Sequence, residues 1–135
     1  MTVPSTPVTP LETDALIVGA GPAGLFQVFE LGLLGIKSHV VDTLQHPGGQ
    51  CAELYPDKPI YDIPALPVCG AQELVDRLMQ QIAPMCPVFH FGEEVAELVK
   101  RDDGRFFLRT SAGTEFLART VVIAGASGVV GNAAL

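Results

Sequence analysis

The segment Gly19-Ala20-Gly21-Pro22-Ala23-Gly24 constrains the fold of this chain more than any other feature. Its spacing is G-x-G-x-x-G, and it directly follows the continuous apolar run 15–18, which is typical of a strand buried on both faces. A helix is expected over 22–35 and a second buried strand over 38–41. A strand, a glycine turn, a helix and a strand within about thirty residues predict a β-α-β unit with a parallel strand pair.

Each glycine of this segment suits the binding of a dinucleotide pyrophosphate. Gly19 allows a tight turn, Gly21 lets a phosphate approach the backbone, and Gly24 lets the helix pack closely on the strand. The helix that begins at Pro22 and Ala23 presents unpaired N–H groups and a partial positive charge to the phosphates. We therefore expect these residues to bind a dinucleotide.

Asp42 stands where the second strand ends, 18 residues after Gly24, and a carboxylate there can accept hydrogen bonds from ribose hydroxyls. It would repel a 2′-phosphate, and no Arg or Lys lies between it and Lys58. The first nucleotide site is therefore predicted to hold FAD or NAD rather than NADP. The alternative is a glycine-rich turn without a nucleotide, in which Asp42 only caps the strand end.

The rest of the chain completes an α/β pattern. Residues 1–12 contain three prolines and no apolar periodicity, and are expected to form a flexible Pro-rich arm. Segment 45–67 is rich in Pro and Gly and is predicted to be a functional loop, whereas 71–85 has the apolar spacing of an amphipathic helix. A Rossmann-like parallel sheet with crossover helices is expected, together with a small antiparallel β-meander. The further strands are expected at 88–91, 95–100, 106–110, 115–118 and 120–124.

The charge balance argues against two classes of partner. Eight Lys and Arg stand against 15 Asp and Glu, giving a net charge of −7. We therefore expect neither nucleic acid nor an anionic membrane as a partner. The apolar stretch 15–36 is interrupted by several glycines, which argues against a membrane span.

The spacing of the cysteines and histidines does not indicate a metal site. Three cysteines without a C-x-x-C pattern predict neither a zinc ribbon nor a dithiol centre, and suggest reduced thiols in a cytoplasmic protein. His39, His46 and His90 lack the spacing of metal ligands and are expected to be core or loop residues. The acidic group at Glu93, Glu94 and Glu97 is expected to form a solvated face.

A series of short motifs at tight spacing resembles one family. The resemblance is to the thioredoxin-reductase-like (type 2) ferredoxin–NADP reductases, and it covers about residues 12–125, with 48–64 as its most specific part. After Asp42, the motifs are Pro47-Gly48-Gly49-Gln50-Cys51, Glu53-Leu54-Tyr55-Pro56, Ile60-Tyr61-Asp62-Ile63-Pro64 and Ala71-Gln72-Glu73-Leu74.

The resemblance implies a flavoprotein with FAD in an extended conformation. Its adenosine ribose would lie on Asp42 and its adenine against the backbone of Val95, and the loop that carries Gly49, Gln50 and Tyr55 would reach the flavin half. The family's members are homodimers in which NADPH reduces FAD and FAD passes single electrons to ferredoxin. Neither the motifs nor the resemblance indicates a catalytic residue in this chain.

The chain also departs from the family pattern. Val28 occupies a helix position where these folds usually have a small residue, and Cys51 stands where an apolar residue is common. Segment 125–131 reads G-x-x-G-x-x-G and resembles a second nucleotide turn, but 132–135 is too short for its helix. We therefore expect 13–135 to be a partial FAD-binding domain, a fragment without the NADPH domain and the C-terminal FAD segment, and inactive alone. Two alternatives stay open: a flavin-dependent reductase or monooxygenase of other specificity, and an inactive truncated remnant.

Overall fold

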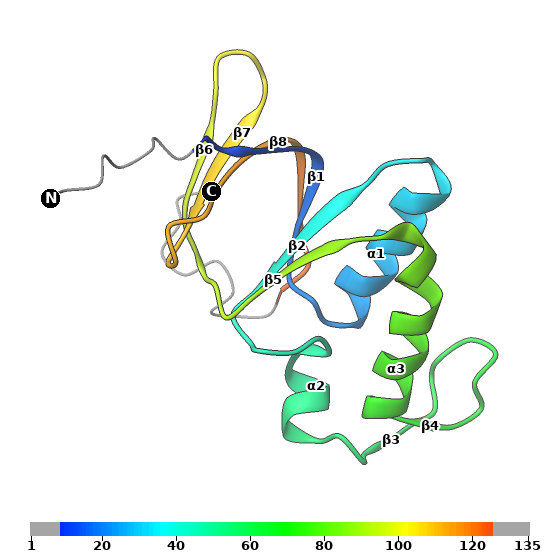
Figure 1. Cartoon of the computed structure of the whole chain (residues 1–135). Coiled ribbons are helices and arrows are strands. Elements are labelled where there is room, and N and C mark those ends of the chain that lie inside the picture. Colours follow the sequence, from blue (N-terminus) through cyan, green and yellow to red (C-terminus); the bar gives the residue numbers. More distant parts are fainter. Residues whose placement is uncertain (1–8, 126–135) are drawn as a thin grey trace, which may run out of the picture.

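The computed structural model describes residues 9–125, and Figure 1 shows their arrangement. Two long helices pack on a twisted sheet, and a short helix lies at the end of the sheet where the glycine turn is found. In chain order the elements are β1 (Leu11–Val18), α1 (Pro22–Leu33), β2 (Ser38–Asp42), α2 (Gly49–Leu54), β3 (Pro59–Ile60), β4 (Cys69–Gly70), α3 (Ala71–Ile82), a 3₁₀ turn (Ala83–Met85), β5 (Val88–Phe91), β6 (Val95–Lys100), β7 (Phe106–Thr110) and β8 (Glu115–Ile123).

Six of the strands form one mixed sheet in the order β5-β2-β1-β8-β7-β6. The four strands β5, β2, β1 and β8 are parallel, with β1 in the middle of this group, next to both β2 and β8. The remaining strands continue the sheet as an antiparallel meander from β8 through β7 to β6. The expected α/β fold, a Rossmann-like parallel sheet with an antiparallel meander, is confirmed.

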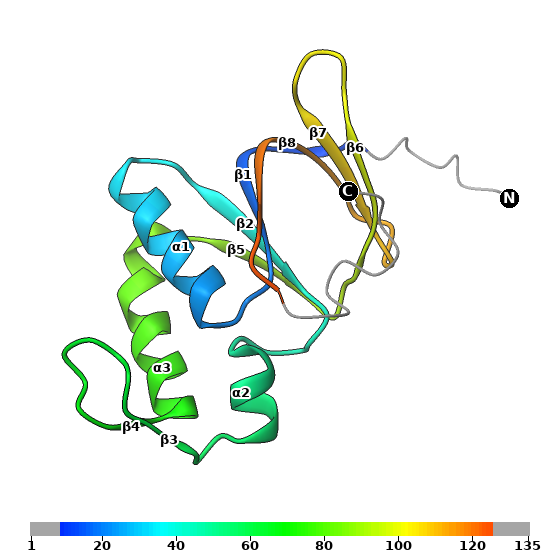
Figure 2. The same cartoon turned by 180° about the vertical axis from the view of Figure 1, so that it is seen from behind.

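Alternation along the strands divides the core between two faces of the sheet. Ile17 of β1 and Val40 of β2 face α1 and α3, where they join one buried cluster with Leu25 and Val75. The neighbouring residues, Leu16 among them, face the opposite way and pack with residues of β6, β7 and β8 in a second cluster. Figures 1 and 2 show the two helices on one face and the meander folded over the other.

The first helix begins and ends for local reasons. Pro22 occupies the first turn, where a missing N–H costs no hydrogen bond. At the other end the N–H of Gly35 donates to Gly32 and that of Ile36 to Leu31, the pattern of a Schellman motif with a left-handed residue at Gly35. The helix expected over 22–35 is thus confirmed, with its last helical residue at Leu33.

Two strand boundaries differ from the prediction because their partners are distant in sequence. β1 begins at Leu11, so the end of the expected Pro-rich arm 1–12 is paired, with Leu11 opposite Phe116. β8 is one strand of nine residues rather than two pieces broken at Arg119. Its first half pairs with β7 and both halves pair with β1, so β8 joins the meander to the parallel strands. Residues 1–8 of the expected arm lie outside the described residues.

The segment 45–67 is less irregular than its composition suggests. It contains the six-residue helix α2, and it is closed by the two-residue pair of β3 and β4, with Pro59 opposite Gly70 and Ile60 opposite Cys69. Helix α2 was not predicted, because six residues between the glycines and Tyr55 are too few to show helical periodicity.

Two further observations concern the described residues 9–125. None of their helices has both the length and the apolar character needed to cross a membrane. Within the same range, no cluster of three or more His, Cys, Asp or Glu side chains has an arrangement that could hold a metal ion.

Candidate functional site: a glycine cradle at the carboxyl ends of the parallel strands

The predicted nucleotide residues meet where β1 and β2 end. Gly19 follows the last residue of β1, and its N–H donates to the carbonyl oxygen of Val41 in β2 at 2.8 Å. Asp42 ends β2 beside this turn, and α1 begins at Pro22. In open α/β sheets ligands bind at the carboxyl ends of the strands, so the fold places these residues at the expected binding edge.

Two glycines of the turn are required by close backbone contacts. A Cβ atom at Gly24 would lie 1.9 Å from the carbonyl oxygen of Gly19, so any side chain there would force the helix off the turn. Gly19 has a φ of +116°, and a Cβ there would lie 2.6 Å from the backbone nitrogen of Gly125. The roles predicted for Gly19 and Gly24 in turning and packing agree with these contacts.

Gly21 differs from the other two because a Cβ atom there would meet almost nothing. The nearest atom of another segment is the Cα of Gly49, at 3.8 Å. Gly49 adopts a φ of +68° and approaches Gly21 backbone to backbone, while the N–H of Gly48 donates to the carbonyl of Ala20 at 2.8 Å. We call Gly21 and Gly49, with the first turn of α1, the glycine cradle.

The start of α1 gives the cradle its electrostatic character. Gly21 is the N-cap residue, no side chain caps the helix, and the first turn holds no acidic residue. The first intrahelical bond runs from the N–H of Leu25 to Gly21, which leaves the N–H groups of Ala23 and Gly24 available to a ligand. An open cradle at an uncapped helix N-terminus fits an anion such as a pyrophosphate.

Asp42 is buried, with 3% of its surface exposed, and its carboxylate is tied to the turn. The N–H of Ala20 donates to Oδ2 at 2.6 Å, and the N–H of Leu44 donates to Oδ1 at 2.9 Å. An ionised carboxylate has about four acceptor positions, so both oxygens keep capacity for further donors. Asp42 therefore fixes the turn in this structure, and the contact with a ribose stays a prediction.

The residues predicted for the flavin half, Gln50 and Tyr55, and the one predicted for the adenine, Val95, lie in different surroundings. Gln50 is exposed and directly follows Gly49 of the cradle. Tyr55 follows the opposite end of α2, 59% exposed, with the Lys58 Nζ 5.6 Å from the centre of its ring. Val95 is fully buried at the start of β6 in the second core cluster. Their cofactor contacts stay predictions.

Sequence reasoning missed one largely buried acid side chain near this edge. Glu93, expected on a solvated face, has a side chain only 13% exposed and accepts a hydrogen bond from the hydroxyl of Thr110 at 2.6 Å. Its backbone N–H donates to the carbonyl of Asp42 at 3.1 Å. The signal in the sequence was the position of Gly92 and Glu93 in a short turn between two strands, β5 and β6. The strands on both sides restrict where a residue in such a turn can lie. Glu97, by contrast, is half exposed, as expected.

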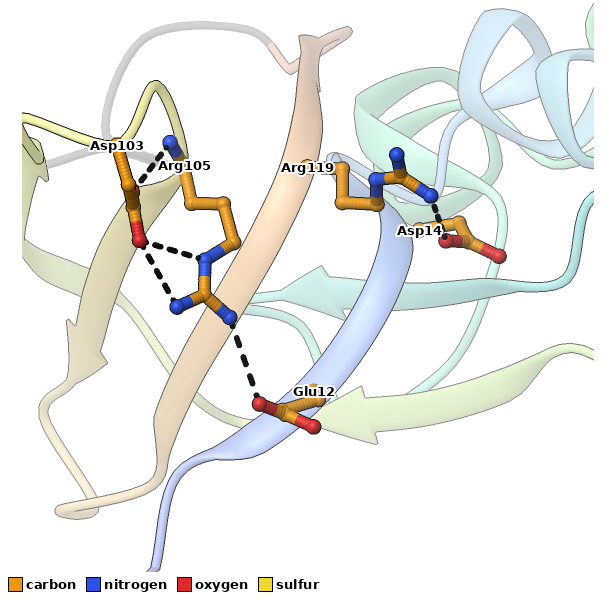
Figure 3. A network of polar contacts seen from close by, with 5 residues as sticks. All are labelled: Glu12, Asp14, Asp103, Arg105 and Arg119. Carbon is orange, nitrogen blue, oxygen red and sulfur yellow. Dashed lines mark hydrogen bonds and ion pairs between the residues drawn. The ribbon is translucent and has the colours of Figure 1, made fainter.

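A charged cavity of about 500 Å³ lies at the other end of the sheet, and its charges are largely paired. It is bordered by β1, β8 and the start of β2. Figure 3 shows Arg105 held by Asp103 and Glu12, and Arg119 beside Asp14. The hydrogen bond to Asp103 raises the pKa of Arg105, and the N–H of Arg105 lowers the pKa of Asp103. Because acids accompany both arginines, this cavity fits an anion less well than the glycine cradle does.

Comparison with known proteins gives the chain its relatives. A family profile described as an NAD(P)-binding Rossmann-like domain matches residues 17–82. The ferredoxin–NADP reductases of Polaromonas naphthalenivorans (strain CJ2) and Methylibium petroleiphilum are each 66% identical over 119 residues. In both cases the match covers 88% of this chain and 32% of the relative. The chain thus spans about a third of the length of these relatives.

Solved structures show the same fold at lower identity. Thioredoxin reductase from Streptococcus pyogenes superposes with a TM-score of 0.74 at 20% identity, covering 87% of this chain and 36% of that chain. The atypical thioredoxin reductase from Desulfovibrio vulgaris Hildenborough has a TM-score of 0.66 at 26% identity, covering 88% and 36%. A closed structure of cyclohexanone monooxygenase matches with a TM-score of 0.69 at 23% identity, covering 86% and 26%.

Proposed function

We propose that this chain, whose resemblance to ferredoxin–NADP reductases is confirmed by relatives 66% identical over 119 residues, holds the adenosine and pyrophosphate of FAD. It would do so within a flavoprotein that passes electrons between NADPH and ferredoxin. The observation that carries the proposal is the glycine cradle, where a Cβ atom at Gly21 would meet only the Cα of Gly49, beside the uncapped first turn of α1.

The residues of the cradle would act on the cofactor through their backbone. The N–H groups of Ala23 and Gly24 point out of the first turn of α1, and we assign them to the pyrophosphate oxygens. The backbone of Gly49 closes the cradle from the opposite side. When bound, FAD supplies a group that accepts a hydride and releases single electrons, which no side chain of this chain provides.

Asp42 supports FAD over a nucleotide with a 2′-phosphate. Its buried carboxylate is held beside the turn by two N–H donors, so its negative charge has a fixed position. The nearest Lys or Arg downstream in sequence is Lys58, which lies over the ring of Tyr55 rather than beside Asp42. We propose that Asp42 accepts the ribose hydroxyls and excludes the phosphate of NADPH, so that NADPH serves as a substrate bound elsewhere in the whole protein.

The loop after β2 is proposed for the flavin half. Gln50 follows the cradle and its amide can donate to or accept from a flavin edge. Tyr55 is exposed, so its ring is free to cover a planar group. Val95 begins β6 close to Glu93, whose N–H is bonded to Asp42, and this supports an adenine contact with its backbone.

The identity of the relatives favours a reductase over other flavin chemistry. Several ferredoxin–NADP reductases are 64–66% identical to this chain, whereas structures of cyclohexanone monooxygenase are 23–24% identical to it and share the fold. By the same resemblance we propose ferredoxin as the electron acceptor, a homodimer for the whole protein and a cytoplasmic location.

Reconstitution with FAD tests this function. The purified chain is incubated with FAD, freed of unbound cofactor by gel filtration, and examined by absorption spectroscopy. We expect flavin bands that travel with the protein, and weaker retention when an excess of ADP competes for the adenosine and pyrophosphate site. A colourless chain that also fails to bind ADP would refute the proposed function.

A further inference from the structure

A line of hydrogen-bonding side chains crosses the second core cluster toward the cradle. His39 of β2 and His90 of β5 lie side by side, with His39 Nδ1 2.9 Å from His90 Nε2. The other ring nitrogen of His90 is 3.8 Å from Glu93 Oε2, and Thr110 donates to Glu93 Oε1. The line thus joins β2, β5, the turn after β5 and β7.

These groups are packed rather than solvated. The two imidazole rings are stacked with centroids 5.2 Å apart, and both meet Phe116 edge to face. The side chains of His90 and Glu93 are 15% and 13% exposed. Burial, followed by the charge of His90, lowers the pKa of His39, and burial lowers that of His90 against the opposing pull of Glu93. Both rings are therefore neutral at neutral pH.

The contacts of the two neutral rings restrict which ring nitrogens can carry their protons. If His90 carries its proton on Nδ1, facing Glu93, its Nε2 accepts a hydrogen bond from His39 Nδ1. One further proton can enter at His39 Nε2, the nitrogen outside this bond, while the bond between the rings is kept, and a second would place two N–H donors 2.9 Å apart. Acid therefore places one positive charge on the pair, and His90 of the pair faces the carboxylate of Glu93.

Glu93 connects this line to the nucleotide edge. Its N–H donates to the carbonyl of Asp42, and the N–H of Gly92 donates to Leu44 at 2.9 Å. Leu44 in turn donates its N–H to the carboxylate of Asp42. The turn Gly92-Glu93 is thus bonded through its backbone to Asp42 itself and to Leu44, one of the two residues whose N–H groups hold the Asp42 carboxylate.

Other charged groups surround the line at both ends. His39 also borders the charged cavity, so the pair exchanges protons with solvent through that side. At the other end the acids bonded to this turn or next to it are Asp42, whose carbonyl accepts the Glu93 N–H, and Glu94, and His46 is paired with Glu53 in the loop beyond. Around the cavity the titratable and charged residues are Glu12 and Asp14 of β1, Lys37, Cys86, Arg105 directly before β7, and Arg119 of β8.

We propose that Glu93 is a positioning residue for the adenosine edge and that the His39–His90 pair makes its position depend on pH. The neutral pair holds Glu93 against Thr110 and keeps the turn on Asp42. A proton on the pair draws the Glu93 carboxylate toward His90 and loosens that turn. This inference rests on the proposed nucleotide function, and it predicts that adenine nucleotides bind less tightly in acid.

ADP is a suitable probe because it carries the adenosine and pyrophosphate of FAD without the flavin. Its dissociation constant is measured by calorimetry from about pH 8 to about pH 5.5, on either side of the ordinary imidazole pKa. We expect the affinity of the wild-type chain to fall by about five- to tenfold over this range, the lower part of the range of coupling between sites.

Three variants separate positioning from a purely structural role, with circular dichroism confirming that each is folded. His39→Gln keeps a hydrogen-bonding partner for His90 but does not titrate, so its affinity for ADP should change less with pH. Glu93→Gln should bind ADP more weakly at pH 8 and also lose the pH dependence. Glu97→Gln, which removes the same charge from an exposed position on β6, should behave like the wild-type chain.

Nuclear magnetic resonance of the chain without ligand gives a second readout. The amide signals of Gly92 and Glu93 should shift with the midpoint of the His39 and His90 imidazoles, and His46 should titrate at higher pH, because its bonds to the Pro47 carbonyl and to Glu53 raise its pKa. ADP binding that is independent of pH, or amide signals that ignore the imidazole titration, would overturn the positioning network alone. Absence of ADP binding at every pH would instead refute the proposed nucleotide function.

Discussion

The glycine turn 19–24 and the loop 43–68 contact each other at the cradle, but different forces hold them in place. The backbone of the turn is packed closely against itself. A Cβ atom at Gly24, for example, would lie only 1.9 Å from the carbonyl oxygen of Gly19. Most of the loop beyond Gly48 is exposed, and it is closed by only two residue pairs between β3 and β4. The turn is therefore held in place by other parts of this chain, whereas most of the surface of the loop is exposed.

The two halves of the proposed FAD site should therefore respond differently to mutation. Changes in the turn should alter the stability of the fold and ligand binding together, because the same backbone atoms serve both. Changes in the loop should alter binding of the flavin half with little effect on stability. Gly21 and Asp42 belong to both the turn and the proposed ligand site. Their variants therefore show how far the effect on stability can be separated from the effect on binding.

The largest effect is expected for Gly24→Ala in the turn. A methyl group there overlaps the carbonyl oxygen of Gly19, so the free energy of unfolding should fall by about 3 kcal/mol, the upper end for overpacking of a core. Chemical denaturation monitored by circular dichroism measures this. A wild-type denaturation midpoint would mean that α1 does not pack on Gly19 as the structure shows.

A smaller loss is expected for Asp42→Ala, which removes the acceptor of two N–H groups. Leaving the buried N–H of Ala20 without a partner should lower the free energy of unfolding by about 1–3 kcal/mol, and loss of the ribose contact should weaken FAD binding by a similar amount. Asp62→Ala in the exposed loop is the matched control, and it should change stability by less than about 0.5 kcal/mol. Unchanged FAD affinity in Asp42→Ala would place the ribose elsewhere.

Gly21→Ala separates binding from stability most clearly. Its Cβ has room in the chain but occupies the space assigned to the pyrophosphate, so FAD affinity should fall at least about tenfold, or 1.4 kcal/mol. The loss of an N-cap glycine should cost less than about 1 kcal/mol of stability. Gly70→Ala, at the N-cap of α3, makes the same change away from the cradle and should bind FAD normally. Equal FAD affinities in the two variants would contradict the cradle.

The smallest change in stability is expected in the loop itself. Tyr55→Ala should alter the free energy of unfolding by less than about 0.5 kcal/mol, because the side chain is 59% exposed. FAD binding should weaken while ADP binding stays constant, since only FAD carries the flavin. Val99→Ala, which removes a side chain that is 46% exposed on β6 and lies outside the loop, is the control. If Tyr55→Ala weakened FAD and ADP equally, Tyr55 would not act on the flavin half.

The sequence predicted the parts of the fold that local rules determine. The apolar runs at 15–18 and 38–41, the proline at the start of α1 and the glycine after its end act within a few residues, and these elements formed as predicted. The start of β1 at Leu11 and the continuity of β8 through Arg119 depend on pairing between segments about 100 residues apart, which periodicity does not register.

The site shows the same distinction between features that local sequence determines and features that depend on distant segments. The contacts of Gly19, Gly21 and Gly24 follow from the spacing of the motif, whereas the burial of Glu93 depends on Thr110, brought to it by the meander. The short helix α2 was missed because its position depends on the Gly48 bond to the turn rather than on its own six residues. The segment 125–131, read as a second glycine turn, lies outside the described residues beyond Gly125.

A titration of the ¹⁵N-labelled chain with FAD, followed by amide chemical shifts, tests whether the glycine cradle is the dinucleotide site. We predict that the largest changes fall on Gly21, Ala23, Gly24 and Gly49, at the start of α1 and across the cradle from it. Saturation of these signals with a single binding isotherm would support one specific site. Largest changes at the charged cavity, on Lys37 and Arg105, with the amides of the cradle unmoved, would contradict it.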